Sequence, residues 1–396
     1  MLALGPLHAG ALMRTDGEQQ PAPARTSSVA RALAASPARI RLDEPTPAEA
    51  QRRVAAATEG RAQIGFPRAV AALRTAGDVV RRLTWSPVDA QRQVASLAIT
   101  SPGASAVRIA LRMGAVPQGT RFRFARSSGT PLEVESGEVE STIARNVYFG
   151  DDSPAAHLYW SPVIEGDTAV LEVEMPTNAL ASDLHIAIPA LSHLVTSAAQ
   201  GFAGSCGAAA CDDDAGPADG AAGVRIVFTE EGATFACNGM LVADRDAQTV
   251  IPYFLTARHC VASQAVASTV QPYWPRGGTS CVREAALDAG IPGATFLHAD
   301  GSADLALVRL QHAPPEGASY AGWTVGAESS VAGQETDLVK VALPAPGSLP
   351  GTAARLGQCA VGTRTSARFE AAYNAGLYQW LGGTPQDAAE GDAGGS

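Results

Sequence analysis

The residues best suited to chemistry lie at the ends of short apolar segments in the second half of the chain. Tyr253-Phe-Leu-Thr-Ala-Arg-His259-Cys260 has the pattern of a buried strand that ends in a histidine and a cysteine. Asp304 opens a later apolar segment, Leu-Ala-Leu-Val-Arg-Leu310. An imidazole can accept a proton from a hydroxyl, and a carboxylate can hold the imidazole in the orientation that this requires. Taken singly, each residue also has a structural interpretation, as a strand-end histidine and a strand-capping aspartate.

Three motifs in this order resemble the first barrel of trypsin-like (chymotrypsin-fold) serine proteases, and within them the bacterial lysyl-endopeptidase-like branch. Cys237-Asn-Gly-Met-Leu-Val matches C-x-G-x-L-V, the segment ending in His259-Cys260 matches L-T-A-x-H-C, and the segment from Asp304 matches D-x-A-L-[LV]. The resemblance implies that His259 is the general base and Asp304 the buried carboxylate that orients it. Asp300, outside the apolar segment, is the fallback for that carboxylate.

The nucleophile is where the resemblance fails. The family's attacking serine stands in G-[DS]-S-G-[GS], and Pro-Gly-Ser348-Leu349-Pro-Gly lies at the right place in the chain. Leu349 occupies the attacking position, however, and Ser348 the position before it, so Ser348 is only a candidate that a rearranged loop could present. Gly-Asp-Ala393-Gly-Gly copies the motif with alanine, behind the last predicted helix and with no strand after it to line a pocket. Without a serine oxygen, covalent catalysis lacks its first step.

All six cysteines lie in the second half of the chain. An even set confined to one domain indicates disulfides and an oxidising compartment, with reduced core cysteines as the alternative. The family resemblance implies three pairs: Cys206–Cys359, Cys211–Cys281 and Cys237–Cys260. The last pair has independent support if its two cysteines lie on adjacent strands, where a bridge would fix the histidine loop against the sheet.

The composition limits the possible partners. With 46% hydrophobic and 17% charged residues among 396, the chain is typical of a globular protein of two to three domains. A formal charge of -10 argues against nucleic acid or an anionic membrane as a partner. No apolar run reaches the ~18 to 20 residues of a membrane span. The first eleven residues lack the basic region of a signal peptide, so secretion is expected from the cysteines and the resemblance.

We expect no cofactor. The histidines and cysteines show no zinc spacing, and no phosphate-binding loop motif occurs. The family resemblance implies a polypeptide substrate and the chain's own pro-region as partners, in a monomer.

The surrounding segments predict an all-β protein. The family resemblance implies a chymotrypsin-like double β-barrel with a truncated second barrel and a C-terminal helix, preceded by a small antiparallel β pro-domain. The predicted regions are a disordered leader (1–42), a helical or linker segment (43–94), a β-rich pro-region (95–195), a linker (196–205), the trypsin-like protease domain (206–383) and a disordered tail (384–396).

The region 43–94 should begin with a helix. Thr46-Pro-Ala-Glu49 combines a capping threonine, a proline at the first helical position and a glutamate that completes a capping box, so the helix should run to about Glu59.

The region 95–195 alternates apolar and polar residues, as in Val107-Arg-Ile-Ala-Leu-Arg-Met113. Such alternation predicts half-buried antiparallel strands with one face in water. Tyr159-Trp-Ser-Pro-Val-Ile-Glu-Gly166 also resembles the pro-region of the family, which implies a folding aid or inhibitor that is later removed. A sandwich that binds carbohydrate or protein is the alternative.

The first barrel is predicted to be complete, from five strands: 226–228, 236–242, 253–257, 268–273 and 305–310. Between Trp323 and Cys359 the second barrel is shortened, through a true deletion or a gene-model error. Apolar residues at helical spacing from Arg368 to Leu381 predict the closing helix.

The sequence thus predicts a secreted serine endopeptidase, made as a precursor and, by resemblance, cutting after basic residues. The alternative is a catalytically inactive homologue or a truncated fragment, because the nucleophile motif is broken.

Overall fold

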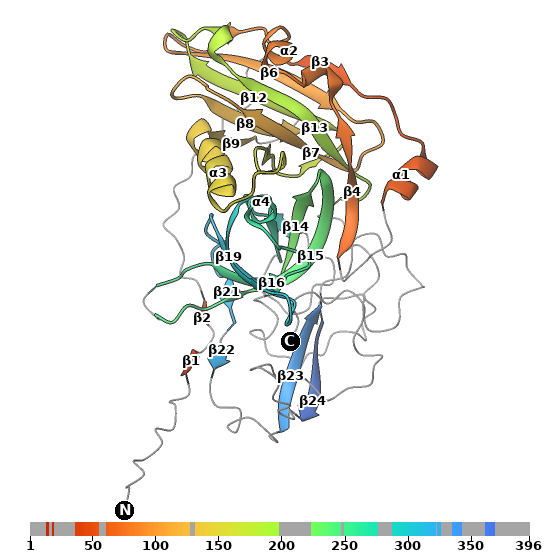
Figure 1. Ribbon diagram of the computed structural model, residues 1–396, viewed down its shortest axis with the longest axis vertical. Coiled ribbons are helices and arrows are strands. Elements are labelled where there is room, and N and C mark those ends of the chain that lie inside the picture. Colours follow the sequence, from red (N-terminus) through yellow and green to blue (C-terminus); the bar gives the residue numbers. More distant parts are fainter. Residues whose placement is uncertain are drawn as a thin grey trace, which may run out of the picture.

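The computed structural model describes most of the chain from residue 36 to residue 321 and several strands outside that range. The described residues are 36–54, 61–126, 131–197, 223–246, 249–275 and 287–321, with strands at 13–15, 18–19, 323–325, 335–342 and 361–368. We call residues 36–197 the N-terminal unit and residues 223–321 the barrel unit. Figure 1 shows the two units stacked, with one group of strands running from the first into the second.

The N-terminal unit packs two sheets against each other. The first has six strands: β3 (Ala38–Arg41), β5 (Ser86–Pro87), β6 (Arg92–Thr100), β8 (Arg121–Arg126), β9 (Leu132–Glu135) and β12 (Thr168–Pro176). The second comprises β4 (Ala62–Ala69), β7 (Ala106–Met113), β10 (Tyr159–Trp160), β11 (Ile164–Glu165) and β13 (Ile186–Leu194). The alternating residues Val107 and Ile109 of β7 pack with Leu97, Phe122 and Leu171 of the first sheet in one buried cluster.

Short helices cover the edges of this unit. They are α1 (Pro47–Arg53), η1 (Ala71–Leu73), α2 (Ala76–Val80), α3 (Ser136–Tyr148) and η2 (Ala181–Asp183). α3 contacts α4 (Gln264–Ala267) of the barrel unit, and both lie where the two units meet in Figure 1.

The barrel unit is a curled antiparallel sheet. Its strands are β14 (Gly223–Glu230), β15 (Ala233–Val242), β16 (Tyr253–Ala257), β17 (Gln271–Pro275), β18 (Leu287–Ala289), β19 (Ala294–Asp300) and β20 (Leu305–Leu310). The pairs run β18-β17-β14-β15-β16-β20-β19. β17 pairs back to β14, and β20 pairs back to β16, so this sheet also joins strands that are distant in the sequence. Apolar side chains from all parts of this curl, among them Ile226, Leu241, Phe254 and Val308, form a second buried cluster.

The two units share one sheet because β4 lies between β13 and β15. One edge of β15 pairs with β14 along its length, so its other partners must share the opposite edge. On that edge Thr234–Ala236 pair with β4, and Gly239–Val242 pair with β16. β4, a strand of the N-terminal unit, therefore follows β16 along the same edge of β15.

The remaining strands are short or form a separate hairpin. β1 (Met13–Thr15) pairs with β22 (Trp323–Val325), and β2 (Glu18–Gln19) pairs with β21 (Ser319–Tyr320). β23 (Glu335–Ala342) and β24 (Val361–Arg368) pair with each other. Among the described residues, no helix is long and apolar enough to cross a bilayer.

The prediction of an all-β, chymotrypsin-like fold is confirmed, with a curled sheet at the place of the predicted first barrel. The five predicted barrel strands differ in one case. Residues 268–273 were predicted as a strand, but Ser268 caps α4 and the strand begins at Gln271, because Thr269 bends its hydroxyl back to the carbonyl of Val266 (2.8 Å). Arg368, the predicted start of the closing helix, is the last residue of β24, and the rest of that helix and the tail lie outside the described residues.

The predicted limits of the first half are wrong in two places. Residues 38–41 belonged to the disordered leader in the prediction, yet β3 pairs in parallel with β6 and buries Ile40 in the core. Residues 62–69 belonged to the helical or linker segment, yet they form β4. The apolar run of β4 is short and interrupted by Gly65 and Pro67, so its local sequence gives little indication of a strand. The strand is buried because it pairs with β13 on one side and with β15 on the other.

Helix α1 starts as predicted but ends earlier. The hydroxyl of Thr46 accepts the backbone N–H of Glu49 at 3.2 Å. The Glu49 carboxylate pairs forward with Arg53 at 2.5 Å, and the helix ends there instead of continuing to Glu59.

The expectation of one wet face in the β-rich region is also wrong. Arg123, Glu172 and Glu174 are all buried, and the Arg123 guanidinium binds both carboxylates at 2.9 Å. The polar alternation is real, but paired charges satisfy one another, so a polar strand face can be covered without leaving a charge unpaired.

Candidate active site

His259 lies in a tight turn directly after the central strand β16. β16 has β15 on one side and β20 on the other, and its side chains alternate between buried and less buried positions. The turn is closed by the N–H groups of Cys260 and Val261, which both donate to the carbonyl of Ala257. We call residues 258–262 the histidine loop.

Antiparallel pairing brings Asp304 to the same place. Ala257 is the last residue of β16 and pairs with Leu305, the first residue of β20. The residues just beyond this pair, His259 on one strand and Asp304 on the other, therefore share one end of the sheet although 45 positions separate them.

Asp304 holds the histidine by two contacts. One carboxylate oxygen lies 2.5 Å from Nδ1 of His259, and the other accepts the backbone N–H of His259 at 2.9 Å. A third bond joins the backbones, from Arg258 N–H to the carbonyl of Asp304 at 3.0 Å. Both the imidazole and the loop that carries it are thus oriented by one aspartate.

The backbone of Asp304 takes a left-handed conformation, with φ of 49°. Aspartate and asparagine tolerate this region better than most residues with a Cβ. The conformation turns the carboxylate back toward the histidine loop, instead of outward along β20.

The carboxylate is more exposed than the resemblance implied. The Asp304 side chain is 53% exposed, whereas that of His259 is 17% exposed. A buried carboxylate was expected, and the exposure follows from the position of Asp304 in a turn at the sheet's end. Because the carboxylate is half exposed to water, the geometry of this contact matters more than its contribution to stability.

The predicted disulfide Cys237–Cys260 is present, with 6.4 Å between the Cα atoms. It ties the histidine loop to β15, the neighbouring strand. The structure explains why the C-x-G-x-L-V motif has a glycine at position 239. A Cβ there would lie 2.4 Å from the carbonyl oxygen of Leu255 and 2.5 Å from the ring of Phe254. The close approach of β15 and β16 therefore requires glycine.

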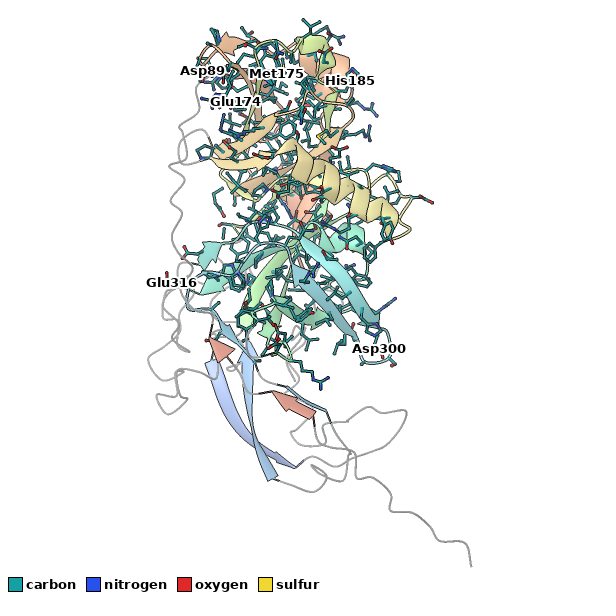
Figure 2. All side chains as sticks on the ribbon, turned by 90° about the vertical axis from the view of Figure 1, so that its left-hand side faces the viewer. Asp89, Glu174, Met175, His185, Asp300 and Glu316 are labelled. Carbon is teal, nitrogen blue, oxygen red and sulfur yellow. A yellow bond between two sulfur atoms is a disulfide. The ribbon has the colours of Figure 1, made fainter. Side chains whose placement is uncertain are left out.

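The other predicted site residues divide into two groups. Asp300 does not replace Asp304, because its carboxylate accepts the N–H and hydroxyl of Ser302 at 2.7 and 2.6 Å. These bonds to Ser302 lower the pKa of Asp300, and Figure 2 shows Asp300 at the end of the barrel unit farthest from the N-terminal unit. The second group lies outside the described residues: Cys206, Cys211, Cys281, Cys359, Ser348, Leu349 and Ala393.

Nε2 of His259 is the nitrogen that would take a proton from a serine. It is buried and has no hydrogen-bond partner among the residues that the structure describes. A pocket of about 350 Å³ lies between Phe149–Asp152 and Ala262–Gln264, but neither His259 nor Asp304 lines it. The geometry thus supplies an imidazole that a carboxylate orients through Nδ1.

One cluster near the site has the composition of a metal centre. Ligand atoms of Cys237, His259 and Cys260 lie within 4.8 Å of one another. The two sulfurs are bonded to each other, so they offer no thiolate to a metal ion.

Sequence reasoning missed one residue at this site, Arg61 of the N-terminal unit. Its guanidinium donates to the backbone carbonyl of His259 at 3.3 Å and to the carboxylate of Glu230 at 2.6 Å. No local pattern indicates this, because 198 positions separate Arg61 from His259.

Comparisons with known proteins agree with this architecture. Residues 34–195 match the family described as lysyl endopeptidase N-terminal domain, and residues 200–345 match the lysyl endopeptidase C-terminal domain. The lysyl endopeptidase of Pseudomonas aeruginosa is 30% identical over 265 residues, which cover 61% of this chain and 54% of that protein. The match thus spans about half the length of that relative.

Proposed function

Because this chain belongs to the lysyl endopeptidase family, we propose that it is a serine endopeptidase with His259 as general base and Asp304 as its orienting carboxylate. The observation that carries the proposal is the double contact of Asp304, to Nδ1 and to the backbone N–H of His259. Bonding at Nδ1 leaves Nε2 as the nitrogen that exchanges a proton with a hydroxyl.

In the proposed reaction a serine hydroxyl attacks the carbonyl of a peptide bond while Nε2 of His259 takes the serine proton. The imidazolium that forms is stabilised by the Asp304 carboxylate, and it returns its proton to the leaving amine. Ser348 is our candidate for that serine. The relative's name, lysyl endopeptidase, motivates a polypeptide substrate cut after lysine.

We also propose that the protein is secreted as a precursor and that the N-terminal unit is its pro-region. The disulfide beside His259 suits an oxidising compartment. The match of residues 34–195 to a separate N-terminal family domain supports the pro-region.

Fluorophosphonate labelling tests the activity directly. The intact protein should bind the probe covalently at one serine, identified by peptide mass spectrometry, and Ser348→Ala should abolish the label. His259→Ala should lower the rate of cleavage after lysine by on the order of a million-fold. Asp304→Asn should lower it about 10⁴-fold, because the imidazole loses the acceptor that fixes its tautomer.

A second candidate function is favoured by Leu349 and Ala393, which stand at the serine positions of the two motif-like segments. In that case the chain is a catalytically silent homologue that binds protein through the same fold. Folded protein, shown by a cooperative thermal melt, that takes up no probe at any serine would exclude the endopeptidase and leave this candidate.

A further inference from the structure

The edge of β15 places the start of β4 beside the histidine loop. Going along that edge, β15 pairs with β4 through Ala236 and with β16 from Gly239 onward. Ala62 of β4 pairs with Ala236, and Thr256 of β16 pairs with Gly239. The two partner strands therefore meet near Cys237, with the first residues of β4 facing the end of β16 and the loop that follows it.

Arg61 occupies this junction. Its guanidinium carbon lies 4.5 Å from the centre of the Phe235 ring, which fixes the plane of the side chain against β15. One terminal nitrogen donates to both Glu230, at the end of β14, and the carbonyl of His259. The side chain is 23% exposed, so most of it is enclosed by these groups.

The contact matters because few bonds hold the histidine loop from the outside. Within the loop the N–H groups of Cys260 and Val261 point back to Ala257, and the disulfide fixes Cys260 to Cys237. Asp304 holds the N–H side of His259. Arg61 is the described group that holds its carbonyl side, and it belongs to the N-terminal unit.

We propose that Arg61 is a positioning residue through which the N-terminal unit holds the histidine loop in place. The geometry of His259 in the full chain then depends on the N-terminal unit, and movement of that unit releases the carbonyl of His259. The proposal deepens the proposed function, because it concerns the same base, but its main test does not require activity.

The sequence offers a direct probe of this one bond. His259-Cys260 is the single His-Cys step in the chain. Protein labelled with ¹³C at histidine carbonyls and ¹⁵N at cysteine amides therefore gives one cross-peak in a carbonyl–amide correlation spectrum, from the carbonyl that accepts the Arg61 hydrogen bond.

Three variants of the intact chain separate the possible outcomes. Arg61→Ala should shift the carbonyl resonance upfield and speed exchange of the Cys260 amide by roughly three- to tenfold, because a bond that restrains the loop is lost. In Arg61→Lys the carbonyl resonance should lie between its positions in the unsubstituted protein and in Arg61→Ala, since an ammonium can still donate there. In Glu230→Gln the carbonyl resonance should stay where it is in the unsubstituted protein, because the arginine keeps its contact with the carbonyl.

Arg53→Ala is the matched control. Arg53 also lies over an aromatic ring of the N-terminal unit, 5.4 Å from the centre of Phe66, but it has no contact with the histidine loop among those described. Arg53→Ala should leave the cross-peak unchanged. An unmoved cross-peak in folded Arg61→Ala protein, or an equal shift in Arg53→Ala, would overturn the positioning role.

The readout keeps this proposal apart from the proposed function. If the protein cleaves peptides with its N-terminal unit still in place, Arg61→Ala should lower kcat on the order of tenfold with little change in KM, because the base is misplaced. If the protein does not cleave peptides at all, the endopeptidase proposal fails while the cross-peak still decides the role of Arg61.

Discussion

At the scale of single residues, Asp304 combines two demands on one side chain. It must reach Nδ1 of His259 with one oxygen and the backbone N–H of the same residue with the other. It does so from a left-handed backbone conformation, with φ of 49°. Few residue types meet both conditions, since most side chains with a Cβ are strained at positive φ.

Substitutions at Asp304 should therefore separate backbone strain from charge. Asp304→Asn keeps a residue that tolerates positive φ and an oxygen that can accept the His259 N–H, so the free energy of unfolding should fall by less than about 1 kcal/mol. Asp304→Ala loses both properties, so its free energy of unfolding should fall by about 2 kcal/mol. Urea unfolding measures the difference, and equal stability of the two variants would contradict this account.

At the scale of elements, β4 and β13 enclose a buried histidine, His193, which lies outside the candidate active site. His193 of β13 stacks on Phe66 of β4 with ring centres 4.7 Å apart, and its Nδ1 lies 2.8 Å from the hydroxyl of Ser101. Arg68 of β4 donates to the same hydroxyl at 2.8 Å. Burial, and then the positive charge of Arg68, lower the pKa of His193 from 6.5 to about 4.

This predicts a loss of stability in acid. Between pH 6.5 and about 4 the unfolded chain binds a proton at His193 that the folded chain does not, so stability should fall as the pH drops through that window and level off below it. Unfolding in urea at pH 7, 6, 5 and 4 measures the slope. His193→Gln should flatten it, whereas His185→Gln, at an exposed position, should not. Identical slopes in all three proteins would show that His193 is not responsible.

At the scale of the whole molecule, the contact between the two units resembles the inside of a domain. Ile64, Ala106 and Leu194 of the N-terminal unit pack with Val227 and Tyr273 of the barrel unit in one buried cluster. Strand pairing between β4 and β15 adds backbone hydrogen bonds across the same boundary. An interface of this kind resists separation, because parting the units would expose both apolar surface and strand edges.

A buried arginine crosses this interface. Arg108 of β7 is fully buried and donates to the Thr229 hydroxyl and the Thr269 carbonyl of the barrel unit, each at 2.9 Å, and to the Ser161 carbonyl at 2.8 Å. Burial lowers the pKa of Arg108 to about 10, which still leaves it charged at neutral pH. Removal of the side chain would leave these acceptors buried without this donor.

We therefore expect the units to stay together after the connection is cut. A protease site engineered among residues 198–222, which join β13 to β14, should give two fragments that co-elute in size-exclusion chromatography. Arg108→Met should destabilise the nicked complex by about 3 kcal/mol and favour separation. Arg112→Met, at an exposed position on the same strand, should change stability by less than about 0.5 kcal/mol. Fragments that part at once in the unsubstituted protein would contradict this expectation.

The sequence by itself determined the parts of the barrel whose signals are local. Apolar runs located β14, β15, β16 and β20, because hydrophobic periodicity is a local signal. Short motifs, and the family resemblance that they carry, singled out His259, Asp304 and the pair Cys237–Cys260. The sequence could not locate β4 as a strand, bury the charges of Arg123 and its carboxylates, or connect Arg61 to the histidine loop. Those features depend on partners far away in the chain, and only the tertiary structure decides which distant groups share an edge, a buried ion pair or a hydrogen bond.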